Sequence, residues 1–177
     1  TMSIANQLSL PQQKLSGTVI LEPSKSISNR ALIIRSLCKD PFEIHRLSTS
    51  DDTDALIAML ASTDEVLYSG HAGSSYRFMV ARACLGDREV KIDASEQLRR
   101  RPIDKLGVDV NEVTLQAGIS SQYLTALLLI APMLPKGLTI HLTGELVSAS
   151  YVQMTLAMMS YFGIQHQWTD DTIRIEH

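Results

Sequence analysis

The stretch "LEPSKSISNRALIIRSLC", residues 21–38, joins strand-like residues to an apolar run with helical spacing through a turn rich in serine. The turn holds three serines and one lysine, and the predicted helix covers residues 29–38. A helix start leaves backbone N–H groups unpaired and carries a partial positive charge, so hydroxyls and cations gathered there suit an anion. The stretch therefore predicts a strand–turn–helix unit whose helix N-terminus, with the turn before it, binds an anionic ligand. We call such a turn and helix N-terminus a helix mouth.

The same strand–turn–helix unit recurs three times further along the chain. Short β-branched or alternating segments predict strands at 17–23, 65–70, 88–93, 109–117, 138–144 and 171–177. Apolar residues at helical spacing predict helices at 29–38, 76–86, 121–134 and 151–163, and a fifth at 48–60 with acidic residues in its first turn. Residues 165–171 are interpreted as a turn. Because the spacing between units is uneven, the pattern favours an α/β layer architecture over a solenoid.

Composition predicts one globular unit. A chain of 177 residues with 45% hydrophobic content can bury a core, so we expect residues 1–177 to form a single domain or one lobe of a larger protein. The net charge of −3 argues against nucleic acid or an anionic membrane as a partner. Cys38 and Cys84 both lie in apolar runs, which is typical of reduced core thiols.

The first thirteen residues, "TMSIANQLSLPQQ", lack the basic start and long apolar stretch of a signal peptide. No apolar run in the sequence reaches membrane-spanning length. We therefore expect a soluble protein of the cytoplasm.

Two cations belong to the first helix mouth. Lys25 and Arg30 are five residues apart, so a turn at Lys25 with the helix beginning beyond it lets both face a ligand. Gly73 in "HAGSSYR" either permits close approach of the backbone to a ligand or adopts a left-handed turn. Arg101 precedes Pro102, which predicts a further helix start, and an arginine there suits bidentate contact with carboxylate or phosphate.

The later helix mouths supply hydroxyl and amide groups. Ser120, Ser121 and Gln122 stand at the third, and Ser148 and Tyr151 stand at the fourth. The five histidines are scattered, and neither metal-ligand spacings nor the glycine-rich nucleotide motifs occur. The residues alone thus predict an α/β domain that binds a phosphorylated, carboxylated small molecule and uses no metal.

These motifs resemble those of the 5-enolpyruvylshikimate-3-phosphate synthase family. "SKSISNRAL" is similar to its specific opening signature, and "SDDTDAL", "HAGSSYR", "RRRPI", "SSQYLTALLLIAP" and "GELVSASY" follow in the family's order. The resemblance covers the amino-terminal half only. It implies one lobe of an inside-out α/β barrel of βαβαββ units, with helix N-termini facing the cleft between two lobes.

The resemblance also implies a reaction. The family transfers the enolpyruvyl group of phosphoenolpyruvate to the 5-hydroxyl of shikimate 3-phosphate and releases phosphate, with no cofactor. Lys25 would contact both substrates and assist proton transfer, with Ser26 and Arg30 on the shikimate ring and carboxylate. By the same resemblance, the 3-phosphate would contact Ser120, Ser121 and Ser148, Gln122 would bridge the substrates, Tyr151 would flank shikimate, and Gly73 and Arg101 would approach phosphoenolpyruvate.

Some positions differ from the family pattern. His71 stands where the family usually has Asn, residues 74–76 replace Thr-Ala-Met, and Ser150 replaces a Pro. The acidic residues thought to act as acid and base belong to the second lobe, so we expect the second lobe as a partner. Two alternatives stay open: a non-catalytic module that binds a phosphorylated ligand, and the related transferase for UDP-N-acetylglucosamine, which the "SKSISNR" start disfavours.

Overall fold

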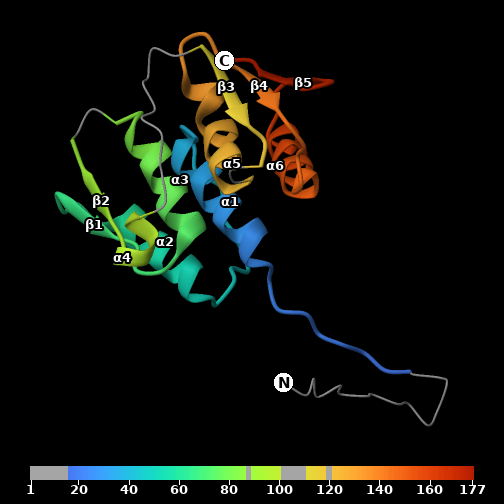
Figure 1. The fold of residues 1–177 in the computed structure, drawn as a ribbon. Helices are drawn as coiled ribbons and strands as arrows, with labels where there is room; N and C mark the ends of the chain where they lie inside the picture. Colours follow the sequence, from blue (N-terminus) through green and yellow to red (C-terminus); the bar gives the residue numbers. More distant parts are fainter. Residues whose placement is uncertain (1–15, 87–88, 101–110, 119–120) are drawn as a thin grey trace, which may run out of the picture.

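The computed structural model describes residues 16–86, 89–100, 111–118 and 121–177, in which helices and strands form a mixed α/β fold (Figure 1). The helices are α1 (Lys25–Leu37), α2 (Asp51–Ala61), α3 (Gly73–Ala83), α4 (Glu96–Arg99), α5 (Ser121–Ile130), the 3-10 turn η1 (Ala131–Met133) and α6 (Ala149–Tyr161). The strands are β1 (Val66–Tyr68), β2 (Lys91–Asp93), β3 (Glu112–Gln116), β4 (Leu138–Thr143), β5 (His166–Thr169) and β6 (Thr172–Ile175). The predicted fold class is confirmed.

The carboxyl-terminal part of the chain forms a βαβαββ unit. Its elements run β3, α5, β4, α6, β5 and β6, and its four strands lie in the order β3-β4-β6-β5. β3 and β4 are parallel, with Val113 opposite Ile140, while β6 runs antiparallel to both β4 and β5. Helix α5 makes the crossover that two parallel neighbours require. This unit is the building block that the sequence resemblance implies.

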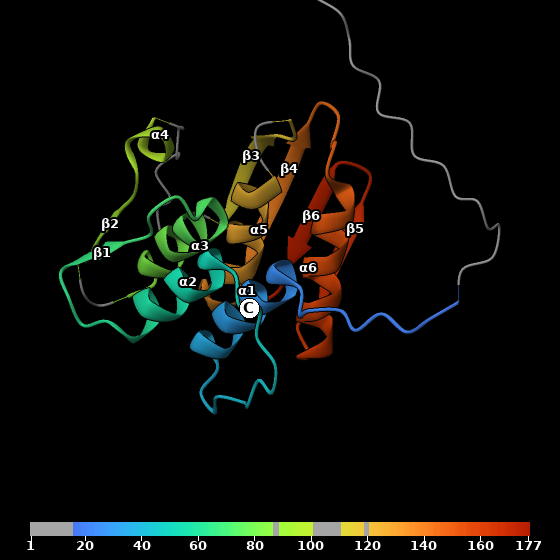
Figure 2. The ribbon, with the colours of Figure 1, turned by 90° about the horizontal axis from the view of Figure 1, so that it is seen from below.

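A second, two-stranded sheet lies on the other side of the helices. β1 and β2 are parallel, with Leu67 opposite Ile92, and α3 connects them. In both ribbon views the two sheets flank the helices, with β1 and β2 on one side and β3 to β6 on the other (Figures 1 and 2). Helices α1, α3 and α5 therefore lie between the two sheets, while α4 lies at the outer end beside β2 (Figure 2).

Helix α5 forms the centre of the hydrophobic core. All eight of its residues from Tyr123 to Ile130 are buried, as expected for a helix that is apolar all round. It packs against α1, α3 and α6, and its side chains belong to one hydrophobic cluster that also includes Ile33 and Ile140. Because α5 is enclosed, its polar first turn is where it meets solvent.

Three helices begin earlier than their apolar periodicity predicts. α1 begins at Lys25 instead of residue 29, α3 at Gly73 instead of residue 76, and α6 at Ala149 instead of residue 151. The polar and small residues of these first turns carry no apolar period, so the pattern places the helix start too late. The expectation of a turn at Lys25, with the helix beyond it, was therefore wrong.

The strand predicted at residues 17–23 and the turn predicted at residues 165–171 need correction. Residues 16–24 do not pair with any strand in the described part of the chain and instead extend away from the body of the molecule (Figure 1). A strand needs a sheet edge beside it, and no edge lies near this segment. Residues 165–171 include strand β5 as well as a turn. The turn between β5 and β6 is short, because Asp170 (φ 51°) adopts the left-handed conformation that a tight hairpin requires.

Both cysteines, Cys38 and Cys84, are free. In the part of the chain that the structure describes, no helix has the length and apolar character needed to cross a membrane. The helix start expected at Pro102 lies outside the described residues.

Candidate functional site

The amino-terminal turns of four helices enclose a polar cavity of about 250 Å³, which we call the arginine pocket. α1 contributes the largest share of its wall, and α3, α5 and α6 supply the remainder. The lining residues are Lys25, Ser26, Asn29, Arg30, Ser74, Phe78, Ser121, Gln122 and Tyr151. The partial positive charges of the helix N-termini add to those of Lys25 and Arg30 in this wall, and together they favour an anion.

A second cavity of about 340 Å³, the histidine pocket, adjoins the first. Its lining residues are Lys25, Asp52, His71, Gly73, Ser95, Gln97, Leu98 and Gln122. Lys25 and Gln122 line both pockets, so they form a common wall. A ligand in either pocket can contact the same ammonium and the same amide.

Arg30 is buried at the base of the arginine pocket and is only 5% exposed. Its guanidinium donates hydrogen bonds to Thr155 Oγ1 (2.7 Å), the Ser26 carbonyl (2.8 Å) and Thr125 Oγ1 (3.2 Å). None of the ion pairs in the described chain includes Arg30. Burial lowers the pKa of this guanidinium to about 10, partly offset by Tyr151. Among the described residues the buried guanidinium thus has neutral hydrogen-bond partners and no counter-ion, an environment that favours contact with an anion.

Lys25 is the first residue of α1, and its side chain is 46% exposed. Its Nζ lies 3.3 Å from Asp52 Oδ1, which also accepts a hydrogen bond from Ser74 Oγ at 3.1 Å. Asp52 stands in the first turn of α2, where the helix dipole favours a carboxylate. The carboxylate thus orients the ammonium at the wall between the two pockets.

A buried polar network joins α1, α2 and α3 beneath the pockets. Asn29 Nδ2 donates to Ser75 Oγ (3.2 Å), and Thr53 Oγ1 donates to Asn29 Oδ1 (2.8 Å). Ser75 Oγ in turn donates to the backbone carbonyl of Asp52. Asn29, Thr53 and Ser75 are all at most 1% exposed. Buried polar groups with satisfied hydrogen bonds fix the relative position of the helices, and with it the position of Lys25 and Asp52.

Gly73 and Gln122 are connected through a buried arginine. Arg77 Nη1 donates to the Gly73 carbonyl and to Gln122 Oε1, each at 2.9 Å. A Cβ atom on Gly73 would lie 3.3 Å from Arg77 Nη1 and 3.4 Å from Gln122 Oε1. Gly73 is helical, not left-handed, so of the two roles considered for it, close approach is the one the geometry supports.

The structure brings most of the predicted site residues together. Lys25, Ser26, Arg30, Ser121, Gln122 and Tyr151 line the arginine pocket, and Gly73 lines the histidine pocket. Ser148 caps the start of α6, three residues before Tyr151, but it is not among the lining residues of either pocket. Arg101 and Ser120 lie outside the described residues.

Several lining residues were missed from the sequence. Asn29 and Asp52 occur inside the motifs "SKSISNRAL" and "SDDTDAL", but Asp52 was interpreted only as a favourable charge in the first turn of a helix. Phe78 has the apolar character of a core residue, and nothing local distinguishes Gln97. Asp52 and Gln97 are brought to the pockets by α2 and α4, an arrangement that only the tertiary structure shows.

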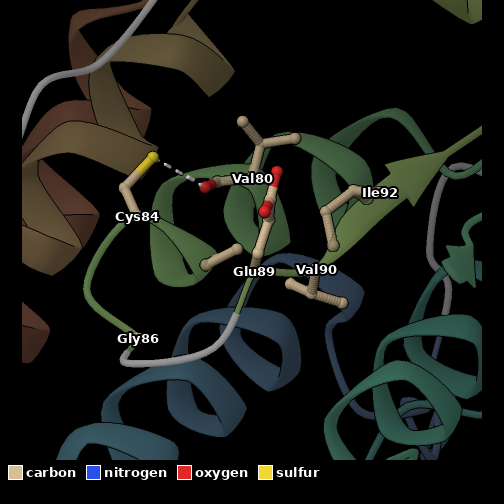
Figure 3. A pocket seen from close by; sticks show the side chains of 7 residues that line it. Val80, Cys84, Gly86, Glu89, Val90 and Ile92 are labelled. Carbon is tan, nitrogen blue, oxygen red and sulfur yellow. Dashed lines mark hydrogen bonds between the residues drawn. The ribbon is translucent and has the colours of Figure 1, made fainter. Parts of the chain in front are cut away.

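A larger cavity of about 540 Å³ lies at the other end of α3 (Figure 3). Its described wall is mainly apolar, with Val80, Val90 and Ile92 beside the carboxylate of Glu89. The Cys84 thiol donates to the Val80 carbonyl (3.3 Å), and burial raises its pKa, which leaves it less reactive. The described residues of this wall include neither a cation nor a helix start, so size alone does not make this cavity the candidate site.

No group of three or more His, Cys, Asp or Glu side chains suited to a metal ion occurs among the described residues. Among the described lining residues of the two pockets, the charged side chains are the cations Lys25 and Arg30 and the carboxylate Asp52.

Comparison with known proteins gives a consistent family. The family model described as EPSP synthase (3-phosphoshikimate 1-carboxyvinyltransferase) matches residues 10–63 and 58–176. The chain is 37% identical over 191 residues to the 3-phosphoshikimate 1-carboxyvinyltransferase of Bacteroides fragilis strain YCH46, covering 93% of this chain and 46% of that protein. For the enzymes of that name from Shewanella piezotolerans and Xenorhabdus nematophila, identity is 31% and 30% over 213 residues, covering 90% and 89% of this chain and 50% of each relative.

The chain spans about half the length of the curated relatives it matches. The matched regions are longer than the chain itself, so these relatives carry additional residues within them. The family match extends over the residues that build both pockets, from the start of α1 to α6. On this evidence the chain belongs to the EPSP synthase family.

Proposed function

We propose that this chain binds shikimate 3-phosphate in the arginine pocket and phosphoenolpyruvate in the histidine pocket. It would contribute Lys25 to the transfer of the enolpyruvyl group to the 5-hydroxyl of shikimate 3-phosphate. The observation that carries the proposal is that two adjoining cavities share Lys25 and Gln122. A transfer reaction needs two substrates in contact, and one common wall gives that arrangement.

The chemistry of each pocket supports its proposed ligand. Arg30 offers a buried guanidinium to a carboxylate, and Ser26 and Ser121 offer hydroxyls to the ring and to phosphate oxygens. Ser120 and Ser148 are proposed as further phosphate ligands, and Arg101 as a ligand of phosphoenolpyruvate. The ammonium of Lys25 would offset the repulsion between the two anions and act on the proton at the reacting centre.

The described walls supply only part of an acid–base system. Among the described residues, Asp52 is the one carboxylate that lines either pocket, and it is paired with Lys25. The proposal is therefore that residues 1–177 form one lobe, and that a second lobe of the same enzyme closes over the pockets and brings the remaining acid and base. The exposed apolar side chains of Val19, Ile20 and Leu21 are consistent with a surface that another part of the enzyme covers.

The test is substrate binding and phosphate release by the purified chain. We expect shikimate 3-phosphate to bind to the chain in a calorimetric titration, and Lys25→Ala to weaken binding by about tenfold, the cost of one charge-assisted contact. Because Lys25 is half exposed, the variant should unfold at the same temperature as the wild type. With both substrates present, the chain alone should release no phosphate above the level of Lys25→Ala.

The possible results bear on the binding site, on the need for a second lobe, and on whether the chain takes part in catalysis at all. Unchanged affinity in a folded Lys25→Ala protein would contradict the proposed site. Phosphate release by the chain alone would mean that it carries its own acid and base, and that the half-site reading is wrong. Binding that persists without turnover after the second lobe is supplied would favour the non-catalytic module.

We further propose that the protein acts in the cytoplasm. Two free cysteines and the absence of a membrane-spanning helix among the described residues are compatible with that location.

A further inference from the structure

His71 lines the histidine pocket from the loop between β1 and α3, two residues before the helix begins. The turn is made by Gly70, whose φ of 61° suits a residue without Cβ. The His71 side chain shares the pocket wall with Lys25, Asp52 and Gln122. His71 is itself exposed, so a titratable side chain stands in a pocket wall that also contains the Lys25 ammonium.

Among the described residues around His71, most charged side chains are paired with an opposite charge. Lys25 from α1 and Asp52 from α2 form an ion pair at 3.3 Å. The lining residues from α5 and from the region of α4, which are Gln122, Ser95, Gln97 and Leu98, are uncharged. The charged side chains of and around α4 are also paired: Arg99 with Asp93 (3.5 Å), and Arg100 with Glu96. Arg77 from α3 lies behind Gln122, with its Nη1 on the Gln122 amide oxygen.

We propose that His71 sets the anion affinity of the histidine pocket, so that protonation of its imidazole adds a cation that strengthens the binding of a dianion. This inference rests on the proposed function, because it takes the pocket to be the one that receives the anionic substrate, phosphoenolpyruvate. It makes His71 a residue that tunes the second substrate site and is not itself a proton donor in the reaction.

The direction of the effect follows from charge. A histidine gains its proton as pH falls from about 8 to 5. A dianion bound beside the imidazole favours its protonated form through the attraction of opposite charges. Binding and protonation are reciprocal, so anion affinity rises as pH falls, and the bound anion makes His71 harder to deprotonate.

The experiment uses sulfate, a dianion whose own charge does not change across the relevant range of pH. The full 177-residue chain, labelled with nitrogen-15, is titrated with sulfate at constant ionic strength at several values between about pH 5.5 and 8.5, a range that spans histidine protonation. The Gly73 amide reports binding in this pocket, and the carbon-bound protons of the His71 ring report its protonation. We expect sulfate affinity to be about three- to tenfold higher at the acidic end. The midpoint of the His71 titration should move upward in sulfate.

Two variants separate His71 from other groups. His71→Asn, which installs the residue that the family resemblance places here, should bind sulfate with an affinity that no longer depends on pH. His45→Asn is the matched control, because His45 is exposed and paired with Glu43 away from both pockets. It should keep the pH dependence of the wild type. Thermal unfolding of each variant checks that its fold is retained.

The outcomes are distinct. A pH dependence that survives in His71→Asn, or sulfate affinity that does not vary with pH in the wild type, would overturn the role of His71 and leave the pocket as an anion site. If sulfate does not perturb the Gly73 amide at any pH, both the inference and the assignment of an anion to this pocket are wrong. Binding of shikimate 3-phosphate in the arginine pocket can be measured separately, so the remainder of the proposed function would still be tested.

Discussion

At the scale of single residues, Arg30 is the position where binding and stability are in conflict. The guanidinium is buried among neutral acceptors, and burial lowers its pKa to about 10. Burying a charge without a counter-ion costs stability unless a ligand supplies the opposite charge. Rings of Phe78 and Tyr151, each 5.8 Å from the guanidinium carbon, offset part of that cost. Arg30 is thus the residue whose replacement best tests the arginine pocket.

We predict that Arg30→Met leaves the ligand-free protein as stable as the wild type or more stable, by up to about 3 kcal/mol. The same change should weaken shikimate 3-phosphate binding at least about tenfold, because a charge-assisted hydrogen-bond partner is lost. Urea denaturation and calorimetry measure the two effects. A loss of more than about 2 kcal/mol in the free energy of unfolding, beyond the cost of ordinary hydrogen bonds, would instead make Arg30 a structural residue.

The difference in stability between Arg30→Met and the wild type depends on pH, and the lowered pKa of Arg30 sets the direction of that dependence. The native state releases the Arg30 proton at a lower pH than the unfolded chain does. The contribution of Arg30 to the free energy of unfolding therefore rises with pH only above about 10. Between about pH 6 and 9 the cost of burying the charge is complete and constant. The stability difference between Arg30→Met and the wild type should therefore be flat over that range and shrink as pH rises through about 10.

At the scale of secondary-structure elements, the start of α3 against α5 sets the size of the histidine pocket. Gly73 occupies the first position of α3, and Arg77 ties it to Gln122 at the start of α5. We predict that Gly73→Ala keeps the fold, because alanine favours a helix by about 0.5–1 kcal/mol over glycine and offsets the contact with Arg77. Affinity for phosphoenolpyruvate should fall about three- to tenfold, a cost of roughly 1 kcal/mol, while that for shikimate 3-phosphate stays within about twofold.

Calorimetry with each substrate measures this split, and thermal unfolding checks the fold. Gly17→Ala is a suitable control, since a Cβ there meets nothing within 4 Å. An equal loss of both affinities in Gly73→Ala would indicate that the first turn of α3 has shifted as a whole, and that the two pockets are not independent.

At the scale of the whole molecule, the apolar segment before α1 lacks a partner in the described chain. Val19, Ile20 and Leu21 are 80%, 82% and 77% exposed, and the curated relatives are about twice as long as this chain. Changing Ile20 and Leu21 together to Ser should leave the free energy of unfolding within about 0.5 kcal/mol, because neither side chain is buried here. The same change should weaken association with the carboxyl-terminal half of the Bacteroides fragilis relative, produced as a separate chain.

Analytical ultracentrifugation of the two chains measures that association. Tyr161→Ser removes an equally exposed side chain, 86% exposed, at the end of α6, and serves as the control. If both changes weaken association equally, or neither does, the segment before α1 is not the contact surface.

The sequence by itself determined the fold class, the five longer helices and the cations at the first helix mouth. Apolar periodicity reports local burial, so the sequence predicts α2 and α5 close to where they lie, and the crowded hydroxyls before residue 29 indicate an anion site. Periodicity carries no signal at polar first turns, which is why it places the starts of α1, α3 and α6 too late, and the single turn of α4 is too short to show a period.

Only the tertiary structure decided which helix mouths share a cavity. Lys25 and Gln122 are 97 positions apart and become one wall because α1 and α5 pack side by side. Asp52, Asn29 and His71 entered the site in the same way, through contacts between α1, α2 and α3. A side chain's neighbours across the core depend on packing between distant segments, and no local pattern of residues encodes those contacts.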